Sequence, residues 1–406
     1  MLGLLACVFF LLAPAVGRAA EYLAIFDEAV AIVEEQFFDP GMNGIDWVTA
    51  VAEHRARVTN DMHRAAFGDE MNALLGRLET SHTQLYTQDD PSWYQLAGVF
   101  WEGANDVAAT LAPQLDDGRP RYVGIGIMTD ERPEGWFVTG VLQGSPAEAA
   151  SILVGDRIVS IEGAPFHPIR SFADRADIET GLAVERRPGE TLDLTVVPAW
   201  LDGVTMFEDA MRASAEVYER DDARVGHIRA WSYAGQKYQD ILIQTIIFGA
   251  LKDADALVLD LRGGWGGANP TYLNLFTDSA ITMTSIGRDG TRFIFASGWA
   301  KPVVLLVDEG TRSGKELIAH GFKALGIGPV VGERTAGAAV GGRINVLSDG
   351  SLLYVAAVDV LVDGERLEGV GVAPDIAVPF DPAFAAGADP QRDRAVEEAA
   401  RLARGD

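Results

Sequence analysis

The sequence predicts a multidomain α+β protein, and three successive patterns along its 406 residues carry that prediction. Apolar residues recur at helical spacing from residue 22 to about 79, and short strands with glycine-rich turns follow from 121 to 200. Strands then alternate with helices, which is typical of a three-layer α/β core around a largely parallel sheet. A chain of this length is expected to form two or three domains.

The composition is that of a protein with large buried cores and an acidic surface. Hydrophobic residues make up 48% of the chain, and 59 acidic against 33 basic residues give a formal net charge of -26. Such a surface repels phosphate backbones and anionic lipid, so we expect no nucleic-acid partner. No grouping of His, Asp and Glu has metal-ligand spacing, and we expect neither a metal nor a cofactor.

The first 20 residues are interpreted as a signal peptide. An apolar run from Leu4 to Val16 precedes small residues that end at Ala20, and the run is too short to span a bilayer. Cys7, the one cysteine, lies in this segment, so the mature chain has no disulfide and no thiolate nucleophile. We therefore expect an exported, periplasmic or secreted protein of the bacterial type, without an integral membrane span in its mature chain.

Residues 21–90 are predicted to form an N-terminal helical bundle, followed by a connecting segment over 91–120. The helical region ends in the polar turn Thr80-Ser81-His82-Thr83. A lone histidine on such a turn is usually solvated or packed, so the Ser81-His82 pair is by itself a weak sign of chemistry. The connecting segment is rich in aromatic residues, which either pack on a neighbour or border a substrate groove.

Residues 121–203 carry several consecutive motif elements of one small β-rich module. They include Tyr122-Val123-Gly124-Ile125-Gly126-Ile127, then Gly144-Ser145-Pro146-Ala147, then Val154-Gly155-Asp156-Arg157-Ile158. This run resembles a PDZ domain, in which a peptide adds a strand to a sheet edge and a loop offers backbone N–H groups to its terminal carboxylate. The resemblance implies that Gly124, Ile125 and Gly126 form that loop. Alternatively, the module only stabilises the assembly.

Residues 204–382 are predicted to form the α/β core, with a C-terminal helix within 383–406. Function is expected at the carboxyl ends of its parallel strands. The strand 256–261 runs into the glycine-rich loop 262–267, and the strand 303–307 runs into a turn and a helix at Ser313. If the two loops adjoin, the N–H groups of Gly266 and Gly314 form an oxyanion hole.

Ser313 has two interpretations at this stage. At the amino end of a helix, backbone N–H groups and the helix dipole favour developing negative charge, which suits a nucleophile. Ser313 followed by Glu316 is also a capping box, in which the hydroxyl only satisfies an orphan N–H group of the helix.

The order of units and motifs resembles the tail-specific, or C-terminal processing, serine peptidases. The motifs are an Asp-Leu-Arg-x-x-x-Gly-Gly loop from Asp260, a Gly-x-x-Ser-x-x-Glu turn around Ser313, and a closing segment from Gly369 to Ile376. The resemblance implies a polypeptide substrate and a core of the Clp/crotonase-like type. In the common branch of the family a lysine 25 residues after the serine is the general base, but here that position holds Ala338.

A second branch, similar to the core of the tricorn protease, uses a histidine that follows a serine and is supported by a glutamate. Ser81, His82 and Glu368 match that pattern. The resemblance implies that His82 accepts the proton of Ser313, while Ser81 holds the imidazole and Glu368 fixes Ser81. A histidine of ordinary pKa, about 6.5, suits this role. Asp359, Asp363 and Glu365 compete with Glu368 for the supporting position.

Other candidate bases are less well placed. His320 lies two helical turns beyond Ser313, out of hydrogen-bond reach, and Lys315 faces another side of the helix. His227 falls on a core strand and is expected to be structural. The remaining histidines, His54, His63 and His167, are expected on the surface.

The leading prediction is therefore an exported serine endopeptidase with PDZ-assisted recognition of polypeptide, possible as an oligomer. The alternative is a catalytically inactive, PDZ-containing peptide- or ligand-binding protein on the same scaffold. A crotonase-like acyl-transfer enzyme also uses paired oxyanion donors, but it gives no reason for the PDZ module.

Overall fold

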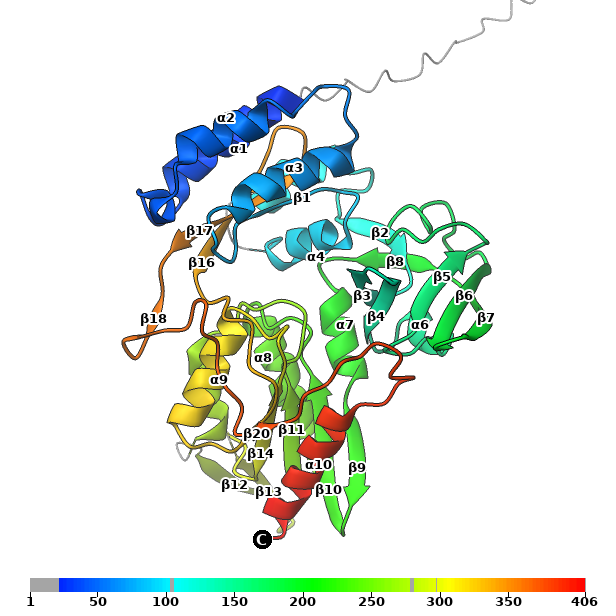
Figure 1. Cartoon of the computed structure of the whole chain (residues 1–406). Coiled ribbons are helices and arrows are strands. Elements are labelled where there is room, and N and C mark those ends of the chain that lie inside the picture. Colours follow the sequence, from blue (N-terminus) through cyan, green and yellow to red (C-terminus); the bar gives the residue numbers. More distant parts are fainter. Residues whose placement is uncertain (1–21, 103–105, 278–280, 297, 406) are drawn as a thin grey trace, which may run out of the picture.

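A computed structural model of the chain describes residues 22–102, 106–277, 281–296 and 298–405. The segment interpreted as a signal peptide, with Cys7, lies outside the described residues. The chain forms three units: helices over a small sheet, a β-rich unit to one side, and a larger α/β core (Figure 1).

The N-terminal unit contains the predicted helices, and they cover a small antiparallel sheet. Phe26, Phe67 and Leu353 are buried at the centre of the interface between helices and sheet. The helices are α1 (Tyr22–Gln36), α2 (Trp47–Arg55) and α3 (Arg64–Gly76), with the short turn η1 (Met42–Gly44). The sheet has the order β1-β17-β16, from β1 (Gln84–Tyr86), β17 (Leu352–Val358) and β16 (Gly341–Val346).

Strands β16 and β17 lie in this sheet and not in the core sheet, to which the sequence pattern assigned them. The reason is that β17 is buried on both faces. Leu353 and Val355 point towards the helices α1–α3, while Leu352 packs with Trp93 on the opposite face. Strand periodicity predicts burial but does not say which sheet a strand joins.

The segment 91–120 contains helices and is more than a connection. α4 (Pro91–Val99) begins at Asp90, whose side chain accepts the Ser92 N–H group at 2.7 Å, and Trp93 is completely buried. α5 (Val107–Leu111) and η2 (Ala112–Gln114) follow. The predicted packing on a neighbour is confirmed, because these helices cover the second face of the small sheet.

The β-rich unit has a five-stranded sheet of order β3-β4-β5-β6-β7 and a separate pair, β2-β8. Val138, Phe172 and Val184 lie at the centre of its core. Its elements are β2 (Arg121–Gly124), β3 (Ile127–Arg132), β4 (Gly135–Val141), α6 (Pro146–Ala149), β5 (Arg157–Ile161), β6 (Thr180–Arg187), β7 (Glu190–Val196) and β8 (Ala199–Asp202).

The core contains the predicted, largely parallel sheet, with the order β20-β15-β14-β11-β10-β9 and only β9 antiparallel to its neighbour. Side chains of β14 alternate between two buried clusters, which is why this strand reads as a continuous apolar run. The strands are β9 (Glu216–Arg220), β10 (Ala223–Arg229), β11 (Ala256–Asp260), β14 (Val303–Val307), β15 (Val330–Gly332) and β20 (Ile376–Ala377).

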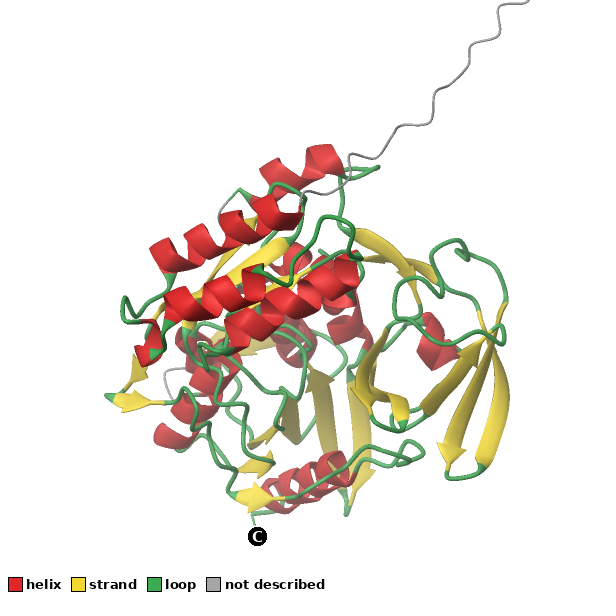
Figure 2. Cartoon of the chain, turned by 45° about the horizontal axis from the view of Figure 1, so that its top comes forward, coloured by secondary structure: helices red, strands yellow, loops and turns green. Residues whose placement is uncertain are grey.

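Helices cover both faces of this sheet, as the three-layer prediction requires (Figure 2). One face carries α7 (Met206–Ala213), α8 (Gln236–Ile243) with its π-helical continuation η3 (Gln244–Phe248), η4 (Pro270–Phe276) and α9 (Gly314–Ala324). The other face carries α10 (Pro390–Ala403), the predicted C-terminal helix. Two hairpins complete the chain: β12 (Thr282–Ile286) with β13 (Arg292–Ala296), and β18 (Leu361–Val362) with β19 (Glu365–Arg366).

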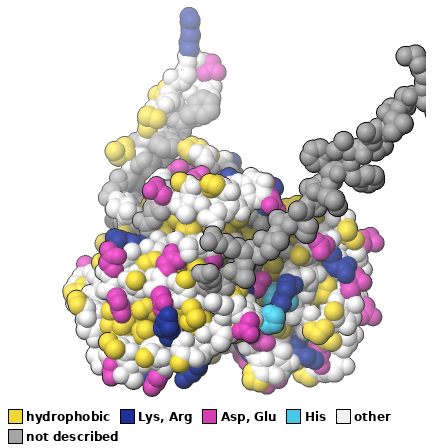
Figure 3. Space-filling model, turned by 90° about the horizontal axis from the view of Figure 1, so that it is seen from above, with side chains coloured by type: hydrophobic (Ala, Val, Ile, Leu, Met, Phe, Trp, Pro, Cys, Tyr) yellow, Lys and Arg dark blue, Asp and Glu magenta, His cyan; other side chains and the backbone are white. Residues whose placement is uncertain are grey.

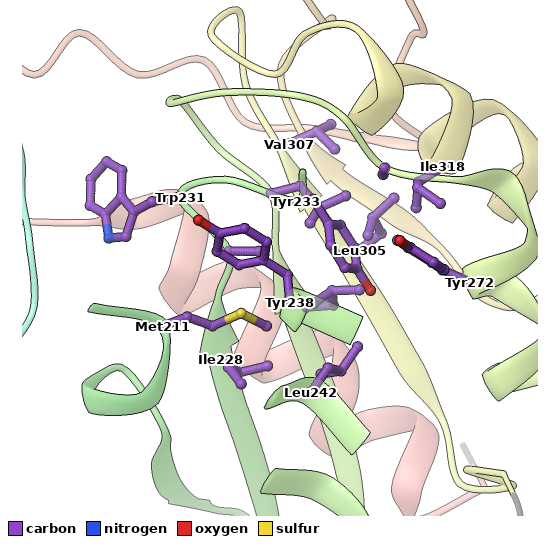
Figure 4. Close-up of a cluster of buried hydrophobic side chains, with 14 of the residues drawn as sticks. Met211, Ile228, Trp231, Tyr233, Tyr238, Leu242, Tyr272, Leu305, Val307 and Ile318 are labelled. Carbon is purple, nitrogen blue, oxygen red and sulfur yellow. The ribbon is translucent and has the colours of Figure 1, made fainter. Parts of the chain in front are cut away.

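A cluster of aromatic and aliphatic side chains fixes the α8 and α9 layer against the sheet (Figure 4). Tyr233 and Leu305 are at most 1% exposed, and Ile318 anchors α9 in the same cluster. Burying a side chain of this size contributes roughly 1.5–3 kcal/mol. The cluster therefore holds the start of α9 rigidly at the carboxyl edge of the sheet.

The face of the molecule seen from above shows no single dominant side-chain type (Figure 3). On the face seen in Figure 3, apolar, acidic and basic side chains are interspersed. Among the described residues, no helix combines the length and the apolar character that crossing a bilayer requires.

Candidate active site

The glycine-rich loop and the Ser313 turn lie side by side, as predicted. They follow β11 and β14, which are parallel neighbours whose carboxyl ends meet at one edge of the sheet. A Cβ atom on Gly266 would stand 2.5 Å from the Cβ atom of Ser313, and one on Gly314 would stand 2.3 Å from the Ala268 nitrogen. Only glycine permits this approach at either position.

Ser313 adopts a backbone conformation that L residues rarely occupy, with φ 57° and ψ −131°. Such a residue costs on the order of 1–3 kcal/mol and persists only where its surroundings hold it. Here its N–H group donates to the Ala338 carbonyl at 2.8 Å and to Glu316 Oε2 at 3.2 Å. The Glu316 N–H group donates to the Ser313 carbonyl at 2.8 Å. Ser313 and Glu316 also form the capping box expected from the sequence, so Ser313 begins the helix as well as facing the site.

Glu316 ties the serine turn to the segment 335–338. Its carboxylate accepts the Thr335 hydroxyl at 2.6 Å and the N–H groups of Gly337 and Ala338 at 2.8 and 2.7 Å. Burial raises the pKa of Glu316, and these bonds oppose that shift. Ala338 thus lies directly beside Ser313, at the position where the common branch of the resembling family carries its lysine.

Ser81, His82 and Glu368 form a continuous hydrogen-bonded chain. Ser81 Oγ lies 2.9 Å from His82 Nδ1 and donates to Glu368 Oε2, also at 2.9 Å. The Ser81 N–H group donates to Glu368 Oε1 at 2.8 Å. Glu368 Oε2 further accepts the Ala339 N–H group at 2.7 Å, so the carboxylate is held from the core side as well.

The competing carboxylates and histidines are engaged elsewhere. Asp359 pairs with Arg366, Asp363 lies 3.2 Å from His320, and His227 contacts the buried Asp260. The expectation for His54 was wrong, because this side chain is 5% exposed and lies 2.6 Å from Glu70. Its helix, α2, turns that residue towards α3, which a weakly amphipathic segment does not reveal.

The pKa of His82 is not the ordinary value on which the sequence-based interpretation relied. Burial lowers it to about 4, with the positive charge of Arg312 acting in the same direction and Glu368 opposing both. The imidazole packs against Tyr354, with ring centroids 5.2 Å apart. His82 is therefore neutral over the whole physiological range of pH.

Ser313 and His82 face a common cavity of about 390 Å³ between the N-terminal unit and the core. We call this the site cavity; Ser81, Gly266 and Ala338 also line it. In the described part of the chain, no hydrogen bond joins the side chains of Ser313 and His82. Aromatic groups complete the wall, namely Tyr86, Phe100, Trp265 and Tyr354. Phe100 belongs to the aromatic segment that the sequence offered as the border of a groove, whereas Tyr86 and Tyr354 were not singled out.

A larger cavity of about 850 Å³ separates the β-rich unit from the core. Arg312 borders both this space and the site cavity, so the two meet next to Ser313. Two tryptophans at the carboxyl edge of the sheet bind the neighbouring units: Trp231 Nε1 donates to Gln143 at 2.8 Å, and Trp265 Nε1 donates to Gln95 at 3.0 Å. For Trp265, its position within the glycine-rich loop 262–267 was the feature of the sequence that could have indicated this contact.

The predicted peptide loop of the β-rich unit lies elsewhere, at a cavity of about 400 Å³. Gly124, Ile125 and Gly126 line it together with Trp136 and Phe166. Gly126 has φ 81°, and a Cβ atom there would stand 2.4 Å from the Cβ atom of Ser145. The loop thus requires glycine, and its neighbours offer an apolar wall.

Comparison with known proteins matches each unit. The sequence model of peptidase family S41 matches residues 224–378, a PDZ domain model matches 123–197, and the tricorn protease C1 domain model matches 18–76. The α/β core of this chain is thus similar to peptidase family S41. The predicted likeness to tail-specific, PDZ-containing serine peptidases is thereby confirmed, together with the fold class.

Two curated relatives share sequence with the chain, and one solved structure shares its fold. The chain is 29% identical over 422 residues to putative tricorn protease homolog 2 of Streptomyces coelicolor, covering 95% of this chain and 33% of the relative. It is 25% identical over 383 residues to the chloroplastic carboxyl-terminal-processing peptidase 3 of Arabidopsis thaliana, covering 89% and 70%. The crystal structure of the tricorn protease shares the fold, with a TM-score of 0.57, 19% identity, and coverage of 95% of this chain and 37% of that one. The chain thus spans about a third of the length of the Streptomyces relative.

Proposed function

We propose that this chain is a serine endopeptidase that uses Ser313 as nucleophile and His82 as general base. One observation carries the proposal: the hydrogen-bonded chain of Ser81, His82 and Glu368 faces the same cavity as Ser313, while the usual lysine position holds Ala338. A strained serine at a helix start, beside two close-packed glycines, supports the role of nucleophile.

The hydrogen-bond chain supports Nε2 of the His82 imidazole as the base. The Ser81 hydroxyl has one proton, which it donates to Glu368. His82 Nδ1 must therefore carry a proton and donate it to Ser81 Oγ, which leaves Nε2 with a free lone pair. Glu368 acts on the imidazole through Ser81, so both are positioning residues.

In the proposed reaction, Ser313 Oγ attacks the carbonyl carbon of the scissile bond and gives its proton to His82 Nε2. The carbonyl oxygen becomes an oxyanion that accepts the N–H groups of Gly266 and Gly314. His82 then protonates the leaving amine as the C–N bond breaks. Water, deprotonated by the same imidazole, hydrolyses the acyl-enzyme and restores the Ser313 hydroxyl.

The low pKa of His82 belongs to the substrate-free state. Burial beside Arg312 keeps the imidazole neutral, and the transition state requires an imidazolium ion. Developing negative charge on the oxyanion supplies part of the compensating charge, and Glu368 supplies the rest through Ser81. Hydrogen bonds of this type commonly tighten only when substrate is bound.

We further propose that the PDZ domain binds polypeptide at the loop 124–126, where the glycine-lined edge and its apolar cavity fit an added strand with an apolar terminal side chain. From residues 1–20 we propose export of the chain to the periplasm or the exterior. Fractionation of cells expressing the chain with and without that segment tests the second proposal.

A second candidate function is peptide binding without catalysis. The observation that favours it is the missing hydrogen bond between Ser313 and His82 in the described structure. Cleavage of an unfolded polypeptide such as reduced casein separates the two. We expect cleavage by the wild-type chain and its loss in Ser313→Ala and His82→Gln, with both variants still folded by circular dichroism. Equal cleavage by Ser313→Ala would remove the catalytic assignment.

A further inference from the structure

Lys315 is a fully buried lysine two residues after the proposed nucleophile. Its side chain is 0% exposed, although it belongs to the first turn of α9. Nζ donates to the Trp231 carbonyl at 3.1 Å and to the Gly263 carbonyl at 2.8 Å. Among the described residues, no carboxylate lies within hydrogen-bond distance of it. Burial of an ammonium ion without such a partner is costly, so this arrangement calls for a function.

The two carbonyl groups belong to two different loops. Trp231 follows β10, and its carbonyl also accepts the Trp265 N–H group at 2.8 Å. Gly263 follows β11 and begins the loop that leads to Gly266. Lys315 therefore binds both loops from the helix that begins at Gly314.

The Gly263 loop is held from a second side by Asp308. Oδ1 of Asp308 accepts the Gly263 N–H group at 2.9 Å and the Gly310 N–H group at 3.0 Å. Lys315 and Asp308 thus grip the carbonyl and the amide of one residue, three positions before Gly266. Slight movement of this loop would separate the two N–H groups that are proposed to bind the oxyanion.

We propose that Lys315 is a positioning residue of the peptidase site, whose ammonium group sets the spacing of the Gly266 and Gly314 amides and contributes positive potential where the oxyanion develops. The inference rests on the proposed function of these two glycines. Fixed positive charge in a water-poor site stabilises developing negative charge more strongly than it does in water.

The protonation of this group makes the role testable through pH. Burial lowers the pKa of Lys315 to about 7; the negative charges of Asp308 and Asp260 oppose that shift, and the positive charges of Arg229 and Arg312 add to it. These four groups, from the ends of β10, β11 and β14, are the charges that act on the ammonium. Above pH 7 the amine still donates hydrogen bonds but no longer carries charge.

The test compares Lys315→Met and Lys315→Arg with the surface control Lys252→Met, using kcat and KM on a fluorogenic peptide and labelling of Ser313 by a fluorophosphonate. We expect kcat to fall by about 10- to 100-fold in Lys315→Met with KM within about twofold. The reason is that the Gly266 and Gly314 N–H groups bind the oxyanion, which exists only in the transition state, so their displacement leaves substrate binding unchanged.

We also expect the kcat of the wild type to fall as pH rises through 7, and this alkaline decrease to be absent in Lys315→Arg. The control should match the wild type.

If Lys315→Met does not fold, Asp308→Asn replaces it, and we expect the alkaline limb of kcat to move to lower pH because an opposing negative charge is removed. Three results would overturn the role of Lys315. The first is a decrease in the kcat of the variant that only matches its loss of folded protein, and the second is a change in KM alone. The third is an alkaline limb of kcat that the substitutions leave unaltered. A wild-type chain that is not labelled at Ser313 would instead overturn the proposed function, and the inference would fall with it.

Discussion

The Ser81 hydroxyl donates to Glu368 at 2.9 Å, across 287 positions of the sequence. Ser81 belongs to the turn that ends the N-terminal unit, and Glu368 belongs to the segment that closes the core. This bond therefore joins two units at the point where the proposed base and nucleophile must meet.

Replacing Glu368 tests whether the carboxylate acts on the imidazole through Ser81. In Glu368→Gln the side chain keeps its shape but loses the charge that supports an imidazolium ion. Hydrogen bonds to charged groups contribute about 1.5–3 kcal/mol, so we expect kcat/KM to fall by roughly 10- to 100-fold. Steady-state kinetics checks this, with Glu365→Gln, on the exposed hairpin β18–β19, as the control that should retain full activity. Full activity in Glu368→Gln would contradict the assignment.

The lowered pKa of His82 predicts how stability depends on pH. In the native state the imidazole takes up its proton near pH 4, whereas in the unfolded chain it does so near 6.5. Between these values the unfolded chain binds more protons, so this group makes the fold less stable as pH falls from 6.5 to 4. Urea denaturation of wild type and His82→Gln at pH 7 and pH 5 measures the effect. We expect the wild type to lose more stability than the variant over that interval; equal losses would contradict the shift.

The same pKa predicts the acid limb of catalysis. The base of the free enzyme should lose its function near pH 4, and not near the ordinary 6.5 of histidine. A profile of kcat/KM against pH, restricted to conditions in which the chain is folded, locates this limb. A midpoint at 6.5 would mean that His82 is solvated in solution.

The two site glycines are predicted to tolerate no side chain. A methyl group on Gly266 would collide with the Ser313 side chain, and one on Gly314 would collide with the backbone at Ala268. We expect Gly266→Ala and Gly314→Ala each to lose activity by at least about 100-fold, the scale of one lost oxyanion donor. Gly76→Ala is the matched control, because its methyl group would meet open space at the end of α3. Peptide cleavage together with thermal melting separates loss of catalysis from loss of fold.

The buried cluster beneath the site offers a prediction on stability alone. Leu305 is fully buried in β14, the strand that leads to the Ser313 turn. Leu305→Ala should lower the free energy of unfolding by about 2–5 kcal/mol, because it leaves a cavity among packed neighbours. Urea unfolding measures this, and a change below about 1 kcal/mol would mean that the layer can collapse around the gap.

Much of the core was predictable because its strands are short, continuous apolar runs bounded by glycine-rich loops. These runs located β11 and β14 in the sequence. The expected parallel pairing of the two strands then predicted that Gly266 lies beside Ser313. The predicted Ser81, His82 and Glu368 came from family resemblance, since nothing in the local sequence says that a turn at residue 82 reaches a segment at residue 368.

Other features depend on tertiary contacts that sequence periodicity does not encode. β17 has apolar residues on both faces, so its pattern fits the core sheet as well as the small sheet it joins. The pKa of His82 follows from burial against Tyr354 and from the charge of Arg312, and both come from other segments. The sequence analysis set Lys315 aside because it faces away from the Ser313 hydroxyl. The role proposed for it rests on its hydrogen bonds to two loop carbonyls, which the sequence does not reveal.

The most direct test of the central claim is fluorophosphonate labelling at pH 7, followed by mass spectrometry of the modified peptide. The account predicts a single adduct on Ser313 in the wild type, labelling slowed by at least about 100-fold in His82→Gln, and none in Ser313→Ala. Labelling at another serine, or equal labelling rates in wild type and His82→Gln, would contradict it.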